Sequence, residues 1–312
     1  MSDIHLVTGG AGFIGSHLTE ALLAKGAEVR VFDNFSTGVR ENFDHLPTRP
    51  EIVEGDLDDP KSVEDAVRGC RFVYHLGALA SVARSVESPL VSHAACCTGT
   101  LHVLDAARRH GVSRVVYAGS SSMYGGEVDP DGQRETMLPV TLSPYAAAKM
   151  AGELYMQAFA STYGIETVRV RFFNIFGPRQ RADSPYSGVI AIFIGLMSEG
   201  KIPLIHGDGL QSRDFTYVGN AVCALTAAMT TPGVSGSVYN VGTGRTIDLL
   251  ELVAALNGIF GTSIAAKHVE ARIGDVKFSR ANIAQIRHDL GYYPLFGFED
   301  GLKKTVEWYR SL

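Results

Sequence analysis

Two side chains four residues apart could carry proton-transfer chemistry. Tyr145 and Lys149 occur in SPYAAAKMAGE, where apolar residues recur at helical spacing, so both side chains would lie on one helix face. A tyrosine has a pKa of about 10, and a base acting near pH 7 needs it lowered by about 3, or roughly 4 kcal/mol. A neighbouring ammonium shifts it in that direction. The same spacing is common on solvent-exposed helices, but Ser120 in AGSSSMYG could also hydrogen-bond a reacting hydroxyl and relay its proton.

A glycine-rich segment near the start of the chain predicts a dinucleotide site. The expected strand Ile4–Thr8 leads directly into TGGAGFIG and then into an apolar helix. Gly9 would permit a tight turn, Gly12 would let the backbone approach a pyrophosphate, and Gly15 would let the helix pack close to the sheet. The alternative is a glycine-rich turn that holds no ligand. A bound nicotinamide cation would favour ionisation of the tyrosine further.

Acidic residues stand at the ends of the next two expected strands. Asp33 could accept both ribose hydroxyls of an adenosine and would repel a 2′-phosphate, which favours NAD over NADP. Its alternative role is a helix cap. Asp56 in EGDLDD could meet the adenine amino group, or it could be the N-cap of the following helix, and the sequence leaves both readings open.

These residues need a parallel sheet to bring them together, and the first half of the chain predicts one. Short β-branched runs alternate with longer helical patterns, which indicates βαβ units and a Rossmann-like, doubly wound α/β fold. The expected strands are Ile4–Thr8, Glu28–Asp33, Glu51–Glu54, Arg71–Leu76, Arg114–Ala118 and Thr167–Phe173. The expected helices are Phe13–Lys25, Asp59–Arg68, Pro89–His110 and Pro144–Tyr163.

After Asn174 the composition of the sequence changes, and stretches rich in Gly, Pro and Ser appear. We therefore expect an NAD-binding domain over residues 1–175 and a smaller α/β substrate lobe over residues 176–312. Segments around residues 215–241 would return to the first domain, as the helical tract Asn220–Met229 and the expected strand Ser237–Val241.

Composition excludes several classes of protein. With 312 residues, 46% hydrophobic and 20% charged, the chain reads as globular, and a net charge of −5 offers no basic surface for nucleic acid. Neither a membrane-spanning run nor a signal peptide is evident, so we expect a cytoplasmic protein. The cysteines lack C-x-x-C spacing and the histidines lack metal-ligand spacing, so we expect reduced thiols and no metal. The cysteines are Cys70, Cys96, Cys97 and Cys223.

Motifs along essentially the whole chain resemble the extended short-chain dehydrogenase/reductase superfamily, and within it the UDP-sugar 4-epimerases. They are TGGAGFIGSHL, VFDNFSTG, Ser120–Gly125, Tyr145 with Lys149, RFFNIFGPRQ, GDGLQSRDFTYV, NVGTG and RIGDV. The resemblance implies NAD, a UDP-sugar substrate and a catalytic set. In that set Tyr145 is the base, Lys149 binds the nicotinamide ribose and lowers the tyrosine pKa, and Ser120 belongs to the hydroxyl relay.

The resemblance also implies two sets of binding residues. Those for the cofactor are Gly9, Gly12, Phe13, Ile14, Gly15, Asp33, Asn34, Ser36, Thr37, Gly38, Asp56, Leu57, Leu76, Gly77, Ala78, Tyr145, Lys149 and Phe172. Those for the substrate are Ser120, Ser122, Tyr145, Asn174, Val189, Leu204, His206, Arg213, Arg272, Asp275 and Ser279. Asn174, Arg213, Arg272 and Asp275 would hold the nucleotide diphosphate and ribose, and Leu204 and His206 would flank the uracil. The alternative for the two arginines is a plain solvent-exposed position.

The chain departs from the family pattern at several positions. Cys96 stands where relatives usually have asparagine, and Gly77 replaces the first of two alanines, both near the expected nicotinamide. Asn220 replaces a common aspartate, which we interpret as a structural change.

The residues after Ser120 bear on the reaction. Dehydratase relatives place Asp-Glu there and decarboxylases usually place a glutamate at the second position, whereas this chain has Ser121 and Ser122. Epimerisation needs only hydride removal, sugar rotation and hydride return, so a UDP-hexose 4-epimerase fits best. ALASVARSVESP and a small residue at Ser279 resemble the branch that accepts N-acetylated sugars.

Other readings remain open. One is a UDP-glucuronate 4-epimerase, with Arg84 or Arg179 pairing with the carboxylate and Tyr186 or another residue closing the lobe. Two more are a reductase that releases NADH and a non-catalytic NAD-binding protein.

The resemblance further implies a homodimer. Helices Pro89–His110 and Pro144–Tyr163 of each subunit would form a four-helix bundle. Apolar residues expected on their outward faces are Val103, Leu104, Leu154 and Phe159. The alternative is that these residues pack on the sheet.

Overall fold

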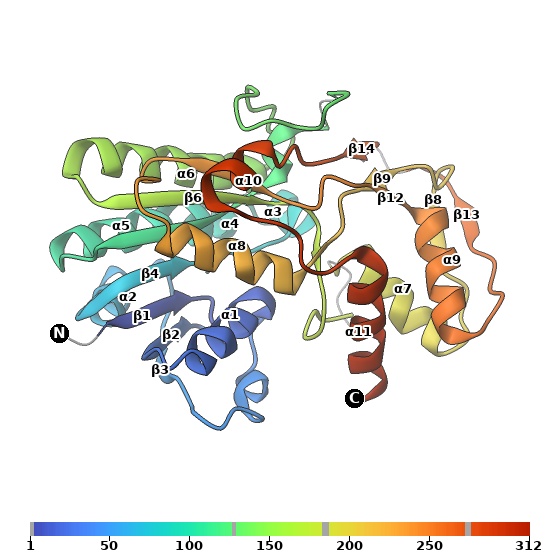
Figure 1. Ribbon diagram of the computed structural model, residues 1–312, viewed down its shortest axis with the longest axis horizontal. Coiled ribbons are helices and arrows are strands. Elements are labelled where there is room, and N and C mark those ends of the chain that lie inside the picture. The colour runs from blue at the N-terminus through green and yellow to red at the C-terminus, as the bar shows by residue number, and fades with distance from the viewer. Residues whose placement is uncertain (1–2, 127–128, 183–186, 272–275) are drawn as a thin grey trace.

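A parallel sheet forms the centre of the computed structural model, which describes residues 3–126, 129–182, 187–271 and 276–312. Within these residues the sheet has seven strands, all paired in parallel (Figure 1). Their order is β11 (Val238–Val241), β6 (Glu166–Phe172), β5 (Arg114–Ser120), β4 (Cys70–His75), β1 (Ile4–Thr8), β2 (Val29–Asp33) and β3 (Glu51–Glu54). The strand order reverses between β1 and β4. The chain thus has the Rossmann-like, doubly wound fold that the sequence predicts.

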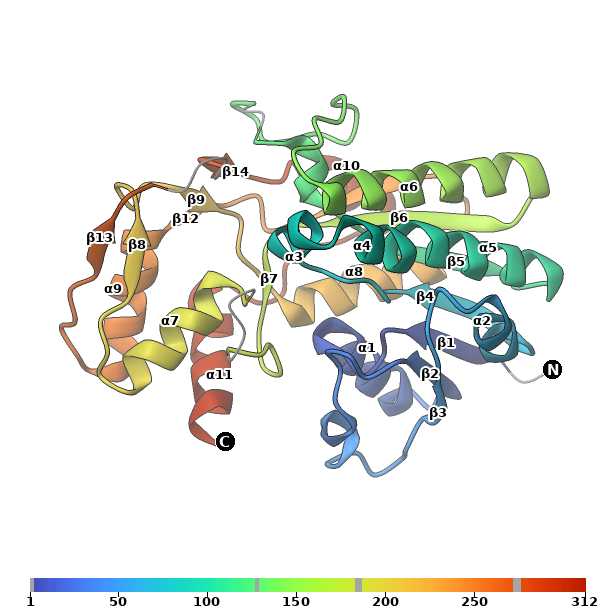
Figure 2. The same cartoon turned by 180° about the vertical axis from the view of Figure 1, so that it is seen from behind.

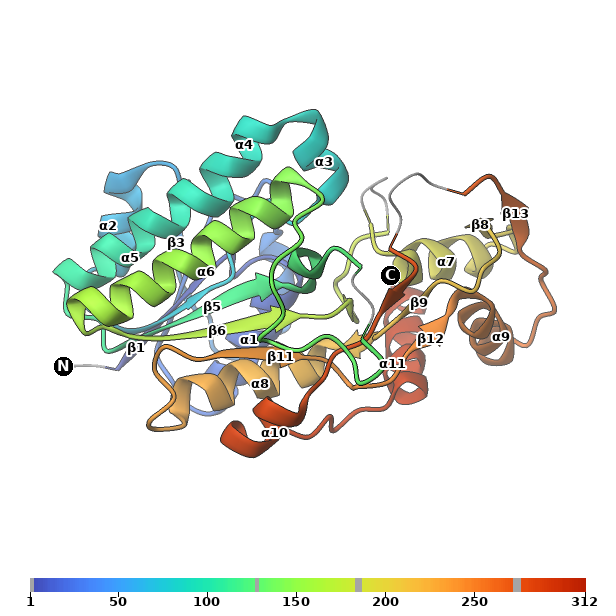
Figure 3. The same cartoon turned by 90° about the horizontal axis from the view of Figure 1, so that it is seen from above.

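Helices cover both faces of the sheet, because successive strand residues point to opposite sides. Leu6 packs in the core beneath α2 (Pro60–Val67), α5 (Gly99–Arg109) and α6 (Pro144–Tyr163). The next residue, Val7, packs in the core beneath α1 (Phe13–Ala24) and α8 (Val218–Thr230), which α10 (Ala284–Leu290) extends. Figure 3 shows these two helical layers on either side of the sheet.

A smaller lobe lies beyond the carboxyl ends of the strands (Figures 1 and 2). Its helices are α7 (Val189–Ser198), α9 (Leu249–Phe260) and α11 (Phe298–Arg310), which enclose a separate apolar core. Its short strands are β8 (Leu204–His206) with β13 (Lys267–Val269), and β9 (Ser212–Arg213) between β12 (Ile247–Asp248) and β14 (Phe278–Ser279). Strands β7 (Ile175–Phe176) and β10 (Thr216–Tyr217) pair where the chain crosses between the two bodies.

The segment that the sequence predicts as one helix from Pro89 to His110 is divided in three. It contains α4 (Pro89–His93), a π-helix (Ala94–Thr98) and α5. The Thr100 hydroxyl donates to the Cys96 carbonyl at 2.7 Å inside this segment. Helix α3 (Val82–Glu87), which precedes α4, is too short to produce an apolar period and was not expected. The predicted bounds of Ile4–Thr8, Glu51–Glu54 and Pro144–Tyr163 are confirmed, and the other predicted elements differ from the observed ones by at most two residues at either end.

Two expectations about side-chain environment need comment. Val103, Leu104 and Phe159 are buried against the sheet, so the prediction that they face outward is wrong; only Leu154 is exposed. Their spacing is apolar because it serves the core of the same subunit. Cys70, Cys96 and Cys97 are buried thiols and Cys223 is half-buried. In the described part of the chain, no helix has the length and apolar character needed to span a membrane.

Candidate active site

A large cavity lies between the carboxyl edge of the sheet and the smaller lobe. Its volume is about 1420 Å³, and residues from both bodies line it. Clefts at the point where strand order reverses are the usual ligand sites of open parallel sheets. The cavity is therefore the place to look for the residues that the sequence singles out.

The glycine-rich turn after β1 is packed too closely for side chains. Gly9 has a φ of +66°, and a Cβ on it would lie 2.8 Å from the Cα of Gly77. A Cβ on Gly15 would lie 2.1 Å from the Gly9 carbonyl oxygen. Gly9, Gly12 and Gly15 all line the cavity, so α1 presents its N-terminus to it, the arrangement that binds pyrophosphates.

A buried histidine fixes this turn to the neighbouring strand. Thr8 Oγ1 accepts from the Gly77 amide at 3.0 Å, and its hydroxyl donates to His75 Nδ1 at 2.7 Å because the neutral ring carries its single proton on Nε2. Thr100 Oγ1 donates to Cys96, so it accepts from His75 Nε2 at 3.0 Å. Burial, with the Lys149 charge nearby, lowers the pKa of His75 to about 3, so the ring is neutral. The sequence contains no local signal for this role.

Asp33, the last residue of β2, and Asp56, which follows β3, line the same cavity. Asp33 accepts from the amides of Ala11 and Phe35, each at 2.9 Å, and burial raises its pKa despite these bonds. Asp56 accepts from Asn34 Nδ2 at 2.7 Å. The N-cap of α2 is Asp59, whose carboxylate accepts from Lys61 and Ser62, so the interpretation of Asp56 as that cap is wrong.

Most residues of the expected cofactor set line the cavity. They are Gly9, Gly12, Phe13, Ile14, Gly15, Asp33, Asn34, Ser36, Thr37, Asp56, Leu57, Leu76, Gly77, Ala78, Tyr145, Lys149 and Phe172. Gly38 is not in the lining, because it packs against Ala11 with room for no Cβ.

Ser120, Tyr145 and Lys149 meet at one end of this cavity. Ser120 ends β5, while Tyr145 and Lys149 lie one turn apart at the start of α6. Burial raises the pKa of Tyr145, opposed by a hydrogen bond with Ser120, and burial lowers the pKa of Lys149. A phenolate at this position therefore needs more positive charge than the chain itself provides.

The Lys149 ammonium is suited to a ligand with hydroxyl groups. Lys149 is buried, and its Nζ lies 4.5 Å from the centroid of the Tyr117 ring. It makes no hydrogen bond to any described residue, although an ammonium has three donors. The hydroxyls of a nicotinamide ribose would supply acceptors here, and the glycine turn and Asp33 match the other half of the same cofactor. The residues present fit NAD.

The expected substrate residues divide into three groups. Ser120, Ser122, Tyr145, Asn174, Arg213 and Ser279 line the cavity, whereas Val189, Leu204 and His206 do not. Arg272 and Asp275 lie outside the described residues. Ser279 pairs in register with Arg213 across β14 and β9, and its hydroxyl is 3.5 Å from Gln133 Oε1. The Ser122 hydroxyl is buried and has no hydrogen-bond partner among the described residues.

The sequence did not reveal the role of Asp214, whose carboxylate connects the two segments of the cavity wall that contain Arg213 and Ser279. Asp214 is fully buried and accepts from the amides of Thr243, Gly244 and Ala281 at 2.8 to 3.2 Å. Asp214 directly follows Arg213 in the chain and accepts from Ala281, two residues after Ser279. It therefore fixes the positions of Arg213 and Ser279 relative to one another. The motifs GDGLQSRDFTYV and NVGTG contain Asp214, Thr243 and Gly244, but the distance between the motifs in sequence hides the contact, and Ala281 lies in neither motif.

A buried ion pair supports the catalytic end. Arg171 donates three hydrogen bonds to the Glu153 carboxylate at 2.9 to 3.1 Å. A Cβ on Gly119, the residue before Ser120, would lie 2.6 Å from Glu153 Oε1. Arg171 also donates to Tyr124, whose hydroxyl donates to Asn240 Oδ1 at 2.7 Å.

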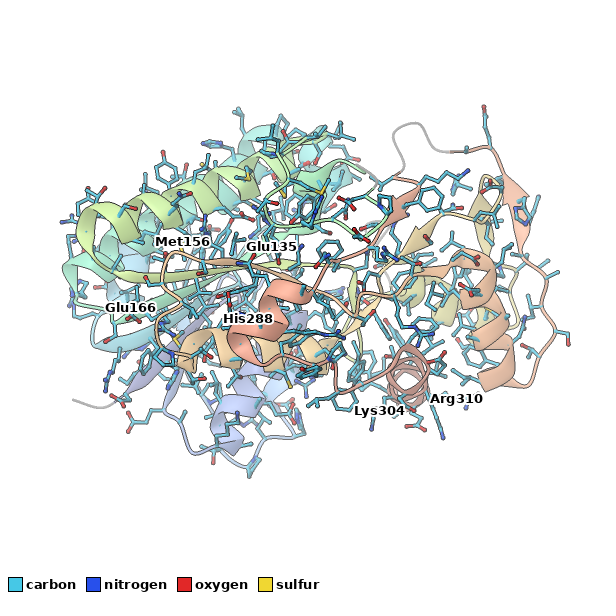
Figure 4. The ribbon with its side chains drawn as sticks, turned by 45° about the horizontal axis from the view of Figure 1, so that its top comes forward. Glu135, Met156, Glu166, His288, Lys304 and Arg310 are labelled. Atoms are coloured by element: carbon cyan, nitrogen blue, oxygen red, sulfur yellow. The ribbon has the colours of Figure 1, made fainter. Side chains whose placement is uncertain are left out.

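The network continues towards the smaller lobe through Asn240. The backbone amide of Asn240 donates to the Glu135 carboxylate at 2.7 Å, and the Asn240 side chain donates to the backbone carbonyl of Gln133. Glu135 is labelled in Figure 4. Gln133 lines the cavity beside Ser279, so the buried polar network joins α6 to the substrate wall.

Comparison with known proteins gives consistent results. Residues 5–242 match the model of a family described as "NAD dependent epimerase/dehydratase family". A UDP-glucose 4-epimerase of Mycolicibacterium smegmatis is 35% identical over 311 residues, 98% of each chain. A UDP-glucose 4-epimerase of Thermotoga maritima, solved with UDP-glucose, has a TM-score of 0.94 at 35% identity, covering 99% of both chains. A UDP-N-acetylglucosamine 4-epimerase of Methanobrevibacter ruminantium, solved with UDP-N-acetylmuramic acid, has the same TM-score and identity over 100% of this chain and 99% of that one.

Proposed function

Because the chain belongs to the NAD dependent epimerase/dehydratase family, we propose that it interconverts the C4 epimers of a UDP-hexose through a 4-keto intermediate. One observation carries this proposal. Ser120, Tyr145 and Lys149 border the same cavity as the glycine turn, while Ser121 and Ser122 offer no second acid or base. Elimination of water would need such a group, whereas epimerisation does not.

The residues of the chain would act in a fixed order. NAD, when bound, supplies a reversible hydride acceptor. Tyr145 takes the proton of the sugar 4-hydroxyl through or beside Ser120, and Lys149 holds the ribose and favours the phenolate. Arg213 holds the diphosphate, so the sugar can turn while its nucleotide stays in place. The turned sugar takes its hydride back at C4 on the opposite face, and Tyr145 returns the proton to the C4 oxygen.

One assay tests the function. The protein is incubated with UDP-glucose, UDP-galactose, their N-acetyl forms and UDP-glucuronate, and the products are separated. We expect each accepted substrate to approach an equilibrium with its C4 epimer, without net formation of NADH. Net NADH would indicate a dehydrogenase, and products lacking water or CO2 would indicate a dehydratase or a decarboxylase.

We expect Ser279 to decide whether N-acetylated sugars are accepted. It is a small residue in the cavity wall next to Gln133, so it leaves space for a 2-acetamido group during rotation. Ser279→Tyr should depress kcat/KM for the N-acetylated substrates at least about 10-fold while UDP-glucose and UDP-galactose stay active. An equal loss for both classes, or a wild type that ignores N-acetylated sugars, would refute this role.

A UDP-uronate 4-epimerase is the second candidate, and Arg84 favours it. Of the two arginines considered for a carboxylate, Arg179 is engaged with Glu20 of α1 and with His45. Arg84 lines the cavity, and its side chain makes no ion pair with a described residue. The M. ruminantium relative binds an acidic sugar nucleotide. Tyr186 lies outside the described residues. Exclusive turnover of UDP-glucuronate in the assay above would establish this candidate.

We also propose that the chain divides as the sequence predicts. Residues 1–175, with segments around 215–241, would hold NAD, and residues 176–312 would hold the UDP-sugar. Pairing of β11 with β6 supports the return of the later segment to the sheet.

A homodimer through α5 and α6 is a further proposal. Leu154, Tyr155 and Tyr163 on α6 are exposed, and a second small cavity lies between α5 and α6. We expect a dimer mass by light scattering at micromolar concentration, and Leu154→Arg should shift it towards the monomer. A wild-type monomer throughout the micromolar range would contradict the proposal.

A further inference from the structure

The first turn of α6 is held by a residue from another helix. The N-cap Ser143 accepts from the amide of Ala146 at 3.1 Å. The amide of Tyr145 has no acceptor within its own helix, as is general for the first turn. It donates to the hydroxyl oxygen of Ser85 in α3 at 3.1 Å. Ser85 thus caps the backbone of the proposed base from sixty residues earlier in the chain.

Ser85 is itself fixed in orientation. It is fully buried, and its hydroxyl donates to the Val82 carbonyl at 2.6 Å, which directs a lone pair towards α6. Ser81 caps the helix by accepting from the Arg84 amide at 3.1 Å. Figures 2 and 3 show α3 beside the N-terminal end of α6. The geometry at Tyr145 therefore depends on the placement of α3.

The same short helix forms part of the cavity wall. Val82, Ala83 and Arg84 line the cavity, and Ser85 follows them directly. A sugar in front of Tyr145 would touch this wall. One hydroxyl thus connects a surface that contacts substrate with the backbone of the proposed base.

We propose that Ser85 is a positioning residue that sets Tyr145 at the distance required for proton transfer. The inference rests on the proposed function. Without the Ser85 hydroxyl, the Tyr145 amide loses its acceptor in a partly buried place, and the first turn of α6 must move to find another partner. A displacement of reacting groups by about 1 Å can cost on the order of 100-fold in rate.

The chain offers a matched control. Ser92 in α4 (Pro89–His93) is also fully buried, and its hydroxyl has no hydrogen-bond partner among the described residues. Ser92→Ala therefore removes the same atom from a similar environment without removing a hydrogen bond. Any effect shared by the two alanine variants reflects lost packing.

The experiment compares Ser85→Ala with Ser92→Ala in the full-length protein. We expect Ser85→Ala to lower kcat at least about 10-fold, with KM and NAD affinity within about 2-fold, because only the reacting geometry changes. Hydrogen exchange at the Tyr145 amide should become faster in the same variant. Ser92→Ala should leave all four quantities close to the wild type.

A second pair of variants separates the loss of the hydroxyl from a general disturbance of folding at residue 85. Ser85→Thr keeps the hydroxyl, and Ser85→Val places a side chain of the same shape as threonine there without a hydroxyl. The threonine variant should therefore retain more of the wild-type kcat than the valine variant. Equal kcat for these two, or faster exchange in Ser85→Ala with unchanged kcat, would overturn the proposal. A wild type inactive on every UDP-sugar would refute the proposed function instead, and unchanged Tyr145 exchange in Ser85→Ala would separately refute the Ser85 contact.

Discussion

Tyr145→Phe is expected to lose at least about 100-fold in kcat, the low end for removal of a general acid or base. The change deletes one oxygen and keeps the ring. That ring packs beside Leu79, Cys96 and Ala148, contacts that phenylalanine preserves. We therefore expect UDP and NAD affinities close to the wild type, with kcat measured at saturating UDP-hexose.

Tyr155 on the same helix provides the control for this variant. Its side chain is partly exposed and does not line the large cavity. Tyr155→Phe should therefore retain wild-type kcat. Unchanged turnover in Tyr145→Phe would remove the tyrosine from the mechanism and, with it, the proposed proton transfer.

Glu153→Gln is expected to cause the largest loss of stability, about 3–5 kcal/mol in the free energy of unfolding. Glu153 and Arg171 are 1% and 4% exposed, and the carboxylate accepts three of the arginine's hydrogen bonds. Glutamine supplies one acceptor oxygen and turns an N–H2 group towards the guanidinium. An uncompensated positive charge then remains in the interior. Urea unfolding of the cofactor-free protein measures the difference.

Two further variants make this test specific. Asp65→Asn breaks the exposed pair with Lys61 and should leave the urea midpoint unchanged. Adding Arg171→Met to Glu153→Gln removes the uncompensated charge, so the double variant should lose less than the sum of the two single losses. Additive losses would show that the two side chains do not depend on one another.

The sequence predicts the fold well because local patterns determine it. Successive residues of β1 point to opposite faces of the sheet, so the adjacent apolar residues Leu6 and Val7 fall into separate cores, and the glycines of the first turn have no room for side chains. Tyr145 and Lys149 are equally local, since one helical turn separates them. Such features depend on neighbours a few positions away.

The supports of the site could not be predicted in this way. His75 meets Thr8 across 67 positions, and Tyr124 meets Asn240 across 116. Asp214 and Ser85 likewise act on residues from distant segments. A buried polar residue looks in the sequence like any serine or aspartate, because its importance comes from the partner that the fold brings to it.

The place of β11 at one edge of the sheet affects how the protein is made. A ribosome completes β6 well before residues 238–241 emerge, and the intervening chain includes α7, β8 and β9 of the smaller lobe. During that interval the nascent sheet has an open edge at β6, of the kind that pairs with other chains. Translation must pass through part of the smaller lobe before the sheet is closed, so an amino-terminal fragment ending near residue 175 would be released with that edge unpaired.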